Sequence, residues 1–308
     1  MTTGDRHHLS SRLSIVIPAF DEEQAIADTL AGLRHCLPQA ELIVVDDGST
    51  DRTRDVVRTF PRVLFVRHAF NRGYGAALKS GMQLATRAYI GWFDADGEMQ
   101  PEDLAAMADT LDRSNVAAVI GQRPRRAVSH VRTVGKMVIR ATAYALGMRM
   151  GHDLNCGLRV FRREAILPYL GILPDGFSAS TTSTMVLAER GYPVAFHPVT
   201  MNSRVGTSKV HLRHGFGALA IVLRTVMLFG PLRIFVGVGL PLFIVGALYA
   251  LAVALVVREG LPALGVVAML IGVLLLLVGL LADQISQMRL AQLRRLDPEP
   301  PAEVTTRE

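Results

Sequence analysis

The chain has 308 residues, which is long enough for one large domain or two ordinary ones with a substantial core. Half of its residues are hydrophobic, and its formal net charge is +6. The two cysteines, Cys36 and Cys156, lack the spacing of metal ligands, so the composition argues against a disulfide framework and indicates a reducing compartment.

The chain begins with a polar stretch. Residues 1–12 lack the apolar region of a cleavable signal peptide, and we expect them to form a disordered tail. A buried strand over residues 13–18 follows and ends at Pro18, which cannot donate to a strand ladder. Asp21 is then expected to cap a helix, with Gln24 three residues later.

Apolar strands and helical segments alternate along the next part of the chain. Strands are expected at residues 41–45, 63–66, 89–94, 116–121 and 193–197, and helices after Asp51, after Gly75, from Pro101 and between Gly176 and Gly191. This alternation with short connections predicts an α/β domain whose mostly parallel sheet is covered by helices on both faces.

The apolar run that begins at Tyr89 ends in three carboxylates, Asp94, Asp96 and Glu98. If strand geometry persists, Asp94 and Asp96 share a face, and Gly97 allows the sharp turn that follows. Carboxylates at the carboxyl end of a parallel sheet suit Mg²⁺ or Mn²⁺ that bridges to a diphosphate. A solvated acidic turn is the alternative for an isolated Asp-x-Asp pair.

Two other nucleotide-binding folds lose support. No Gly-x-Gly-x-x-Gly sequence follows the first strand, and no Walker lysine motif occurs in the chain. These absences weigh against a dinucleotide oxidoreductase and a P-loop protein.

Positive charge gathers between Arg123 and Arg163, where ten Lys and Arg residues stand against one acid, Asp153. Such a stretch suits anionic head groups or a phosphorylated lipid better than nucleic acid in a chain with apolar segments. A merely solvated basic face is the alternative.

Two apolar segments near the carboxyl terminus contain no charged residue, at residues 234–257 and 261–282. At about 1.5 Å per residue, each exceeds the roughly 30 Å hydrocarbon core of a bilayer, which predicts a transmembrane hairpin. Arginines flank the hairpin outside its short connection, at positions 213, 224, 233, 289, 294 and 295. The positive-inside rule therefore predicts that both termini and the large amino-terminal domain are cytoplasmic.

The chain resembles the family 2 inverting glycosyltransferases, which have the Rossmann-like GT-A fold. The resemblance rests on Ser14-Ile-Val-Ile-Pro-Ala-Phe-Asp-Glu-Glu23, Val44-Val-Asp-Asp-Gly-Ser-Thr-Asp51, Asn71-Arg-Gly-Tyr-Gly-Ala-Ala-Leu-Lys79 and Asp94-Ala-Asp96. With the hairpin, the chain is similar to the polyprenyl-phosphate (dolichol-phosphate-type) hexosyltransferases over about residues 13–283.

This resemblance implies a division of the chain. A GT-A domain would span residues 13–210, an interfacial amphipathic segment 211–231, a transmembrane hairpin 232–283 and a cytoplasmic tail 284–308.

The resemblance also implies a donor site with a divalent metal, Mg²⁺ or Mn²⁺. The residues expected to contact the donor nucleotide are Pro18, Phe20, Glu22, Asp47, Arg72, Lys79 and Asp94. Asp96 would bind the metal, with Asp94 beside it. Glu98 stands where related mannosyltransferases carry Gln, so metal binding there is the weaker expectation.

On the acceptor side, the resemblance points to three further segments. Arg123 would face the phosphates, and Asp153 and Arg159 would lie near the acceptor, unless they form only an internal ion pair. Arg204, Ser208 and Lys209 match a mobile loop that closes over the donor and acceptor phosphates. The catalytic set would then be Asp96, Arg123, Arg204 and Lys209.

The implied reaction moves a hexose, with inversion, from a nucleotide-diphospho-sugar to polyprenyl phosphate. Both UDP- and GDP-hexoses fit the sequence. The alternatives are another acceptor, such as a glycolipid, protein or polysaccharide, and a catalytically inactive membrane scaffold that binds nucleotide sugars. Small residues at Gly237, Gly239 and Gly246 would permit self-association through the hairpin.

Overall fold

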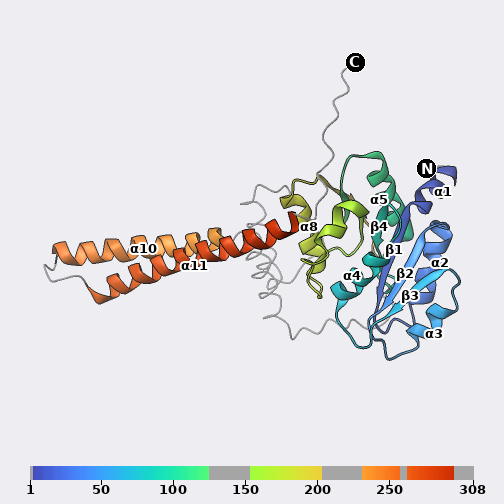
Figure 1. Ribbon diagram of the computed structural model, residues 1–308, viewed down its shortest axis with the longest axis horizontal. Helices are drawn as coiled ribbons and strands as arrows, with labels where there is room; N and C mark the ends of the chain where they lie inside the picture. Colours follow the sequence, from blue (N-terminus) through green and yellow to red (C-terminus); the bar gives the residue numbers. More distant parts are fainter. Residues whose placement is uncertain (1–2, 125–152, 203–230, 257–261, 295–308) are drawn as a thin grey trace, which may run out of the picture. The chain divides into compact units, whose positions relative to one another are not determined.

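A computed structural model of the chain describes residues 3–124, 153–202, 231–256 and 262–294. The chain divides into two compact units, one formed by residues 1–134 and 143–214 and the other by residues 135–142 and 215–308. The first unit contains the sheet and the second contains two long helices (Figure 1). Each unit is considered separately below.

The first unit is built on a seven-stranded sheet in the order β3-β2-β1-β4-β6-β5-β7. Its strands are β1 (Leu13–Ala19), β2 (Glu41–Asp46), β3 (Val63–Arg67), β4 (Tyr89–Trp92), β5 (Ala118–Gln122), β6 (Arg159–Arg162) and β7 (Val194–Pro198). β6 pairs antiparallel with β4 and β5, whereas the other pairings are parallel. The predicted α/β fold with a mostly parallel sheet is confirmed.

Helices surround this sheet (Figure 1). They are α1 (Thr3–Ser11), α2 (Ile26–Cys36), α3 (Thr53–Arg58), α4 (Tyr74–Leu84), α5 (Pro101–Arg113), α7 (Arg163–Ile166), the 3₁₀ helix η1 (Leu167–Tyr169) and α8 (Ala179–Glu189). The first residue of α5 is Pro101, as the sequence predicts, because proline needs no hydrogen-bond partner for a backbone N–H there.

Alternation of side chains explains how both faces of the sheet are covered. Ile15 and Val44 point to the face where leucines of α2 and α5 complete the main core. The neighbouring Val16 and Val45 point to the opposite face and meet α4, where a Cβ on Gly81 would lie 2.3 Å from Val16 Cγ1. The absence of a side chain at Gly81 therefore lets α4 lie directly on the sheet.

Several sequence predictions for this unit were wrong in detail. Helix α1 forms where a disordered tail was expected, and it buries Leu9 against the core. Asp21 does not cap α2, which begins five residues later, because its carboxylate accepts hydrogen bonds from Thr50 instead. Strand β1 continues through Pro18, which pairs in register with Val45.

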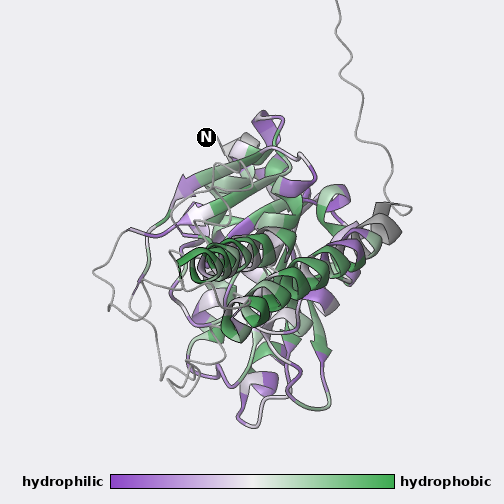
Figure 2. Ribbon diagram, turned by 90° about the vertical axis from the view of Figure 1, so that its left-hand side faces the viewer, coloured by the Kyte–Doolittle hydropathy of each residue, from purple (hydrophilic) through white to green (hydrophobic). Residues whose placement is uncertain are grey.

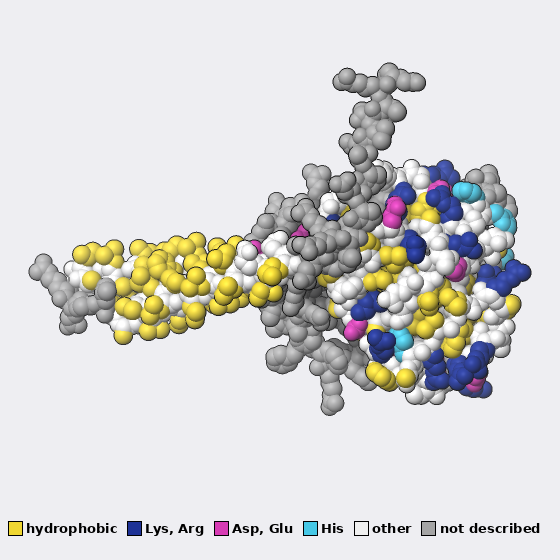
Figure 3. Space-filling view, viewed as in Figure 1, with side chains coloured by type: hydrophobic (Ala, Val, Ile, Leu, Met, Phe, Trp, Pro, Cys, Tyr) yellow, Lys and Arg dark blue, Asp and Glu magenta, His cyan; other side chains and the backbone are white. Residues whose placement is uncertain are grey.

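The second unit contains α10 (Pro231–Val256) and α11 (Ala263–Arg294), which pack against each other. Two segments, Phe235–Val256 and Ala263–Met288, are long and apolar enough to cross a membrane. Hydrophobic residues dominate both helices, and hydrophobic side chains cover the face that is seen (Figures 2 and 3). Helix α11 extends to Arg294, whereas the sequence analysis ended the hairpin at residue 283 and placed a tail after it.

Glycines bring the two helices of this hairpin into backbone contact. A Cβ on Gly239 would lie 2.9 Å from the carbonyl oxygen of Gly272, and one on Gly246 would lie 2.9 Å from Cβ of Ala268. Both glycines therefore face the partner helix within the hairpin. Gly237 has no atom within 4 Å of the Cβ position, so it alone of the three predicted contact glycines is open.

Some predictions fall outside the described residues. These are the catalytic-loop residues Arg204, Ser208 and Lys209, most of the interfacial segment 211–231, the hairpin connection at 258–260 and the end of the tail.

Candidate active site

The candidate site lies beyond the carboxyl ends of β1 and β4. These two strands are neighbours in the sheet. β2 and β3 lie on one side of β1 and β4 lies on its other side, so the strand order reverses between β1 and β4. Open α/β sheets bind ligands in the crevice at such a point. The segment that follows β1 carries Phe20 and Glu22, and the segment that follows β4 carries Asp94 and Asp96.

Hydrogen bonds hold the loop after β1 against the loop after β2. The backbone N–H of Asp21 donates to Ser49 Oγ over 2.9 Å, and the N–H of Glu22 donates to Thr53 Oγ1 over 2.8 Å. Asp21 has a positive φ of 49°, which this network maintains. Phe20 and Glu22 are thereby fixed at the rim of the site, whereas Pro18 is buried within β1.

Asp47 is buried and acts within the protein. Its carboxylate accepts hydrogen bonds from the backbone N–H groups of Arg72 and Gly73, at 2.9 and 2.8 Å, and lies 2.6 Å from Nδ1 of His68. His68 in turn lies 2.9 Å from Ser80 Oγ. Asp47 therefore fixes the loop that precedes α4.

The two predicted donor-site cations are placed differently. Arg72 is exposed on the loop that Asp47 holds. Lys79 instead binds the carboxylate of Asp175 and donates to the carbonyl oxygen of Leu173 over 3.1 Å. Lys79 thus holds the segment before α8 in this structure, and its contact with the nucleotide stays a prediction.

Asp94 stands where three segments meet. Tyr74, the first residue of α4, donates a 2.8 Å hydrogen bond from its hydroxyl to Oδ1 of Asp94. From the other side, a Cβ on Gly157 would lie 2.7 Å from Asp94 Oδ2. The backbone N–H of Asp94 also lies 3.2 Å from Sδ of Met99. These contacts fix the carboxylate in one position.

Burial and two neighbouring carboxylates raise the proton affinity of Asp94. Burial, reinforced by the negative charges of Asp96 and Glu98, raises the pKa of Asp94 to about 7, although Tyr74 and Arg123 oppose the shift. The chain turns sharply at Gly97, whose φ is 75°. Strand β4 ends at Trp92, before the carboxylates. The alternation of side chains along a strand therefore does not place Asp94 and Asp96 on one face.

These carboxylates suit a divalent cation that they coordinate only in part, not one whose ligands all come from the protein. Within the described ranges, no three His, Cys, Asp or Glu side chains converge as a metal-binding group, so Asp94, Asp96 and Glu98 are not gathered around one point in this structure. The backbone N–H of Glu98 donates to Asp96 Oδ1 over 3.1 Å and holds the turn in this shape. Mg²⁺ usually takes one or two carboxylates and completes its shell with phosphate oxygens and water, which fits this arrangement.

Arg123 and Asp153 form an ion pair beside these carboxylates. Nε and Nη2 of Arg123 donate to the two carboxylate oxygens of Asp153, over 2.5 and 3.0 Å. The pKa of Arg123 is raised mainly by its hydrogen bonds to Asp153, and the negative charge of Glu98 contributes to the same shift. Asp153 therefore orients a guanidinium whose field reaches Asp94, as the pKa of Asp94 shows.

Arg159, which the sequence placed near the acceptor, lies in the interior of the first unit. Its side chain is fully buried on β6 and donates to the carbonyl oxygens of Leu154 and Cys156, over 2.6 and 2.8 Å. It also donates to the hydroxyls of Ser183 and Thr184. The predicted Asp153–Arg159 ion pair does not form, because Asp153 binds Arg123. Burial lowers the pKa of Arg159 to about 10.

The entry to the predicted closing loop lies beside the carboxylate turn. The backbone N–H of Asn202 donates to the carbonyl oxygen of Glu98 over 2.8 Å, and Met201 forms a bridge with Met99. Arg204, Ser208 and Lys209 follow within seven residues of this anchor point.

Sequence reasoning missed Tyr74, Gly157 and Phe177. Tyr74 lies within the recognised segment 71–79, so its place before a helix was a usable signal. Its ring stacks on Phe177 at 5.4 Å, and Phe177 is 65% exposed. Gly157 and Phe177 carried no signal of their own, because long-range contacts bring them to the site.

Comparison with known proteins places this geometry in a family. The sequence model of glycosyl transferase family 2 matches residues 14–168, and that of the GtrB C-terminal hairpin matches residues 230–288. The chain is 30% identical over 298 residues to glycosyltransferase AglJ of Haloferax volcanii, covering 92% of this chain and 96% of that protein. It is 27% identical to the polyprenol monophosphomannose synthase of Mycolicibacterium smegmatis, covering 65% and 82%.

A solved structure shares the fold. Glucosyl-3-phosphoglycerate synthase from Mycobacterium tuberculosis, in complex with Mn²⁺, UDP-glucose and phosphoglyceric acid, matches with a TM-score of 0.60 at 18% identity. The match covers 73% of this chain and 84% of that chain. The family match spans most of the strands and loops that build the site described above, and the match to AglJ extends along almost the whole sequence. This chain belongs to glycosyl transferase family 2 and carries a GtrB-type C-terminal hairpin.

Proposed function

We propose that this protein transfers a hexose from a nucleotide-diphospho-sugar to polyprenyl phosphate with inversion at the anomeric carbon. One observation carries the proposal. Asp94 and Asp96 lie at the strand-order reversal of a family 2 fold, beside the Arg123–Asp153 ion pair, in a chain with a GtrB-type hairpin. The relative named polyprenol monophosphomannose synthase supports polyprenyl phosphate as the acceptor.

The donor would lie along the loops after β1, β2 and β4. Phe20 and Glu22 occupy the rim, and Asp47 presents the loop of Arg72 to the nucleotide. Asp96, with Asp94 beside it, would hold Mg²⁺ or Mn²⁺ together with the diphosphate oxygens. Such a cation would stabilise the nucleoside diphosphate as a leaving group. Both UDP- and GDP-hexoses suit this arrangement.

The acceptor is a phosphate monoester whose second pKa is about 6, so it is largely a dianion near neutral pH. It therefore needs no strong general base, and the main task is to bring two anions together. Arg123, oriented by Asp153, would reduce their repulsion, and the loop of Arg204, Ser208 and Lys209 would close over both phosphates. Holding both reactants at a membrane surface would add the advantage of proximity.

The hairpin would anchor the enzyme where its lipid acceptor resides. Its two apolar segments are long enough to span, and the flanking arginines favour a cytoplasmic catalytic domain with both termini on that side. A cytoplasmic site would also have access to nucleotide sugars.

The test is transfer of label to an organic-extractable product. The full chain in nanodiscs would receive polyprenyl phosphate, Mn²⁺ or Mg²⁺, and in separate samples radiolabelled UDP- or GDP-hexoses. We expect metal-dependent label in the lipid phase with one class of donor. Asp96→Asn should abolish it, whereas Asp109→Asn, which alters a helix-surface carboxylate of α5 paired with Arg113, should not.

Two results would contradict the proposal. Release of nucleoside diphosphate without label in the lipid phase would identify another acceptor. Nucleotide binding without turnover by any donor would instead favour an inactive nucleotide-sugar-binding scaffold.

A further inference from the structure

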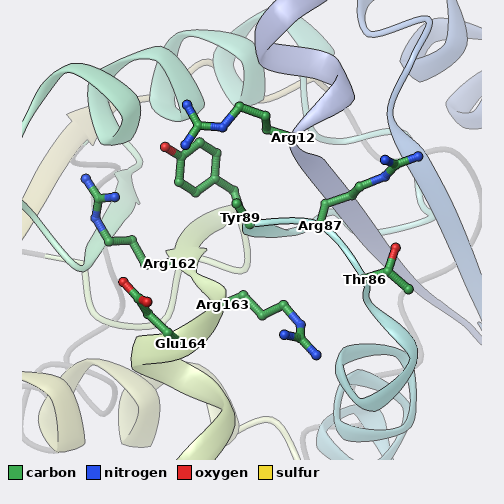
Figure 4. Close-up of a pocket in the computed structure, with 8 residues that line it drawn as sticks. Arg12, Thr86, Arg87, Tyr89, Arg162, Arg163 and Glu164 are labelled. Atoms are coloured by element: carbon green, nitrogen blue, oxygen red, sulfur yellow. The ribbon is translucent and has the colours of Figure 1, made fainter. Parts of the chain in front are cut away.

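A basic cavity of about 470 Å³ lies in the first unit, lined by Arg12, Arg87, Arg162 and Arg163 (Figure 4). Arg12 precedes β1, and Tyr89, which also lines the cavity, begins β4. The cavity therefore lies at the amino ends of these strands, at the edge of the sheet opposite to Asp94. The proposed transfer reaction uses none of these arginines.

The basic cavity carries an excess of positive charge. Glu164 is its one acidic lining residue, and it is exposed. Among the described residues, Arg12 forms an ion pair with Asp112, whereas no carboxylate lies within ion-pair distance of Arg87, Arg162 or Arg163. The cavity thus gathers three guanidinium groups that form no ion pair, although the charge of Glu41, which accepts hydrogen bonds from Thr86, acts on Arg87.

Backbone carbonyls position two of these cations without cancelling their charge. Arg162 donates to the carbonyl oxygens of Leu111, Ser114 and Val116 over 2.8–3.0 Å. Nε of Arg163 donates to the carbonyl oxygen of Ala85 over 2.8 Å. The two terminal nitrogens of this guanidinium take no part in that hydrogen bond. Arg87 is exposed, and its guanidinium and that of Arg163 lie on the side of Thr86 (Figure 4).

The remaining lining selects against aromatic ligands. The ring of Tyr89 carries the guanidinium groups of Arg12 and Arg162 at 4.7 and 5.8 Å, and its hydroxyl donates to Asp112 over 2.7 Å. Two guanidinium groups therefore already lie against this ring, which leaves it less open to stacking by a base. Planar guanidinium groups match phosphate oxygens well, since they donate two parallel hydrogen bonds.

We propose that the basic cavity binds a phosphate-bearing anion, recognised through its phosphate oxygens by Arg87 and Arg163. The phosphate can belong to a soluble metabolite or to a lipid head group, and the recognising chemistry is the same. A bound anion would relieve the repulsion among the clustered guanidinium groups and so stabilise the first unit.

The cavity also touches the connection between two elements of the active site. Residues 85–88 join α4 to β4, and Arg163 holds this connection through Nε and through its backbone N–H, which donates to Ala88 O over 2.8 Å. Helix α4 begins at Tyr74, and β4 leads to Asp94. A ligand here would therefore stabilise the elements that carry the Tyr74–Asp94 contact.

Diphosphate is the probe for a soluble ligand. Its binding to the full chain in detergent would be measured by calorimetry at physiological ionic strength, with EDTA present to suppress metal-dependent binding. Arg87→Glu should weaken binding by about tenfold or more, because it removes a charged donor and adds repulsion. The matched control is Arg58→Glu, which reverses the charge of an exposed arginine on α3 outside the cavity and should change affinity less than about twofold.

Nanodiscs distinguish the lipid source. The protein in phosphatidylcholine would be compared with the protein in phosphatidylcholine plus phosphatidic acid, which presents a phosphate monoester. The unfolding temperature would be followed by the fluorescence of Trp92, the single tryptophan, which lies on β4. A rise with phosphatidic acid that Arg87→Glu removes and Arg58→Glu retains would identify a lipid ligand. If neither probe shows a response that depends on Arg87, or if both variants lose it equally, the proposal is wrong.

Discussion

The hydroxyl of Tyr74 donates a 2.8 Å hydrogen bond to Oδ1 of Asp94, and this bond joins the start of α4 to the end of β4. Burial and the charge of Asp94 raise the pKa of Tyr74 well above its usual value, so the phenol stays protonated and remains a donor. The bond in turn lowers the pKa of Asp94, which burial and the neighbouring carboxylates raise to about 7. Tyr74 therefore favours the anionic form of Asp94, which a cation requires.

Tyr74→Phe should make transfer more sensitive to acid. Without the hydrogen bond, the pKa of Asp94 rises further, and protons compete more strongly with the metal. We expect the Mn²⁺ concentration for half-maximal transfer to rise about tenfold near pH 6.5 and less near pH 8. Metal titrations of the parent and variant at both pH values would measure this. Equal titrations at both would show that the bond does not support the carboxylate.

Gly157→Ala should impair catalysis without unfolding the protein. The new Cβ would lie 2.7 Å from Oδ2 of Asp94 and 2.9 Å from Cε of Met99, so the carboxylate would have to move. A displacement of this size at a catalytic group should lower kcat by about tenfold to a hundredfold. The control is Gly171→Ala, because no atom lies within 4 Å of that Cβ position. Similar rates for both variants would contradict the assignment of Asp94.

Arg159→Met should lower stability rather than acceptor affinity. The substitution leaves the carbonyl oxygens of Leu154 and Cys156 buried without their donor, which costs about 2–4 kcal/mol. The unfolding temperature should fall by about 5–10 °C, as followed by the fluorescence of Trp92, whose ring lies 5.9 Å from the guanidinium. Arg58→Met, an exposed change, should leave it nearly unaltered. A variant of normal stability with a raised KM for polyprenyl phosphate would restore an acceptor role.

Glu189 should make the first unit less stable as pH rises from about 4.5 to about 6. Burial raises the pKa of this carboxyl to about 6, so the folded state binds more protons than the unfolded state across that range. Within the described part of the chain, its Oε2 is buried with no hydrogen-bond partner. Stability is therefore greatest below this range and lost through it, by about 1 kcal/mol in total after solvent screening of this partly exposed group is taken into account.

Glu189→Gln should remove this dependence and raise the unfolding temperature above pH 6. Unfolding curves across the pH range, with the exposed Glu164→Gln as control, would measure it. An unchanged pH profile in Glu189→Gln would show that other groups cause the dependence.

The parallel half of the sheet was predictable because its strands are uninterrupted apolar runs. Strands that are covered on both faces bury nearly every side chain, so their sequences are continuous apolar runs, as in β1 and β2. β6 was missed because it begins and ends with arginine, in Arg159-Val-Phe-Arg162. Both arginines are satisfied by carbonyl groups that are distant in sequence or lie in a neighbouring loop, and no local pattern records such partners.

The site was predictable to a similar degree. Asp94 and Asp96 follow a strand, so their place at the sheet edge comes directly from chain order. The partners of Asp47, Lys79 and Asp153 could not be inferred, because each lies at least twenty residues away. A carboxylate or ammonium in a recognised segment can equally serve the ligand or the loop that holds it. Only the tertiary contacts separate these roles.

The ion pair between Arg123 and Asp153 has a consequence for how the chain can vary. The two residues are thirty positions apart, and hydrogen bonds between the side chain of Gln122 and the backbone of Asp153 reinforce the same junction. The two ends of the segment between Arg123 and Asp153 are therefore held together at one point. Closing a longer loop costs little, about 0.6 kcal/mol for each doubling of its length. We therefore expect that insertions between these residues leave the sheet intact.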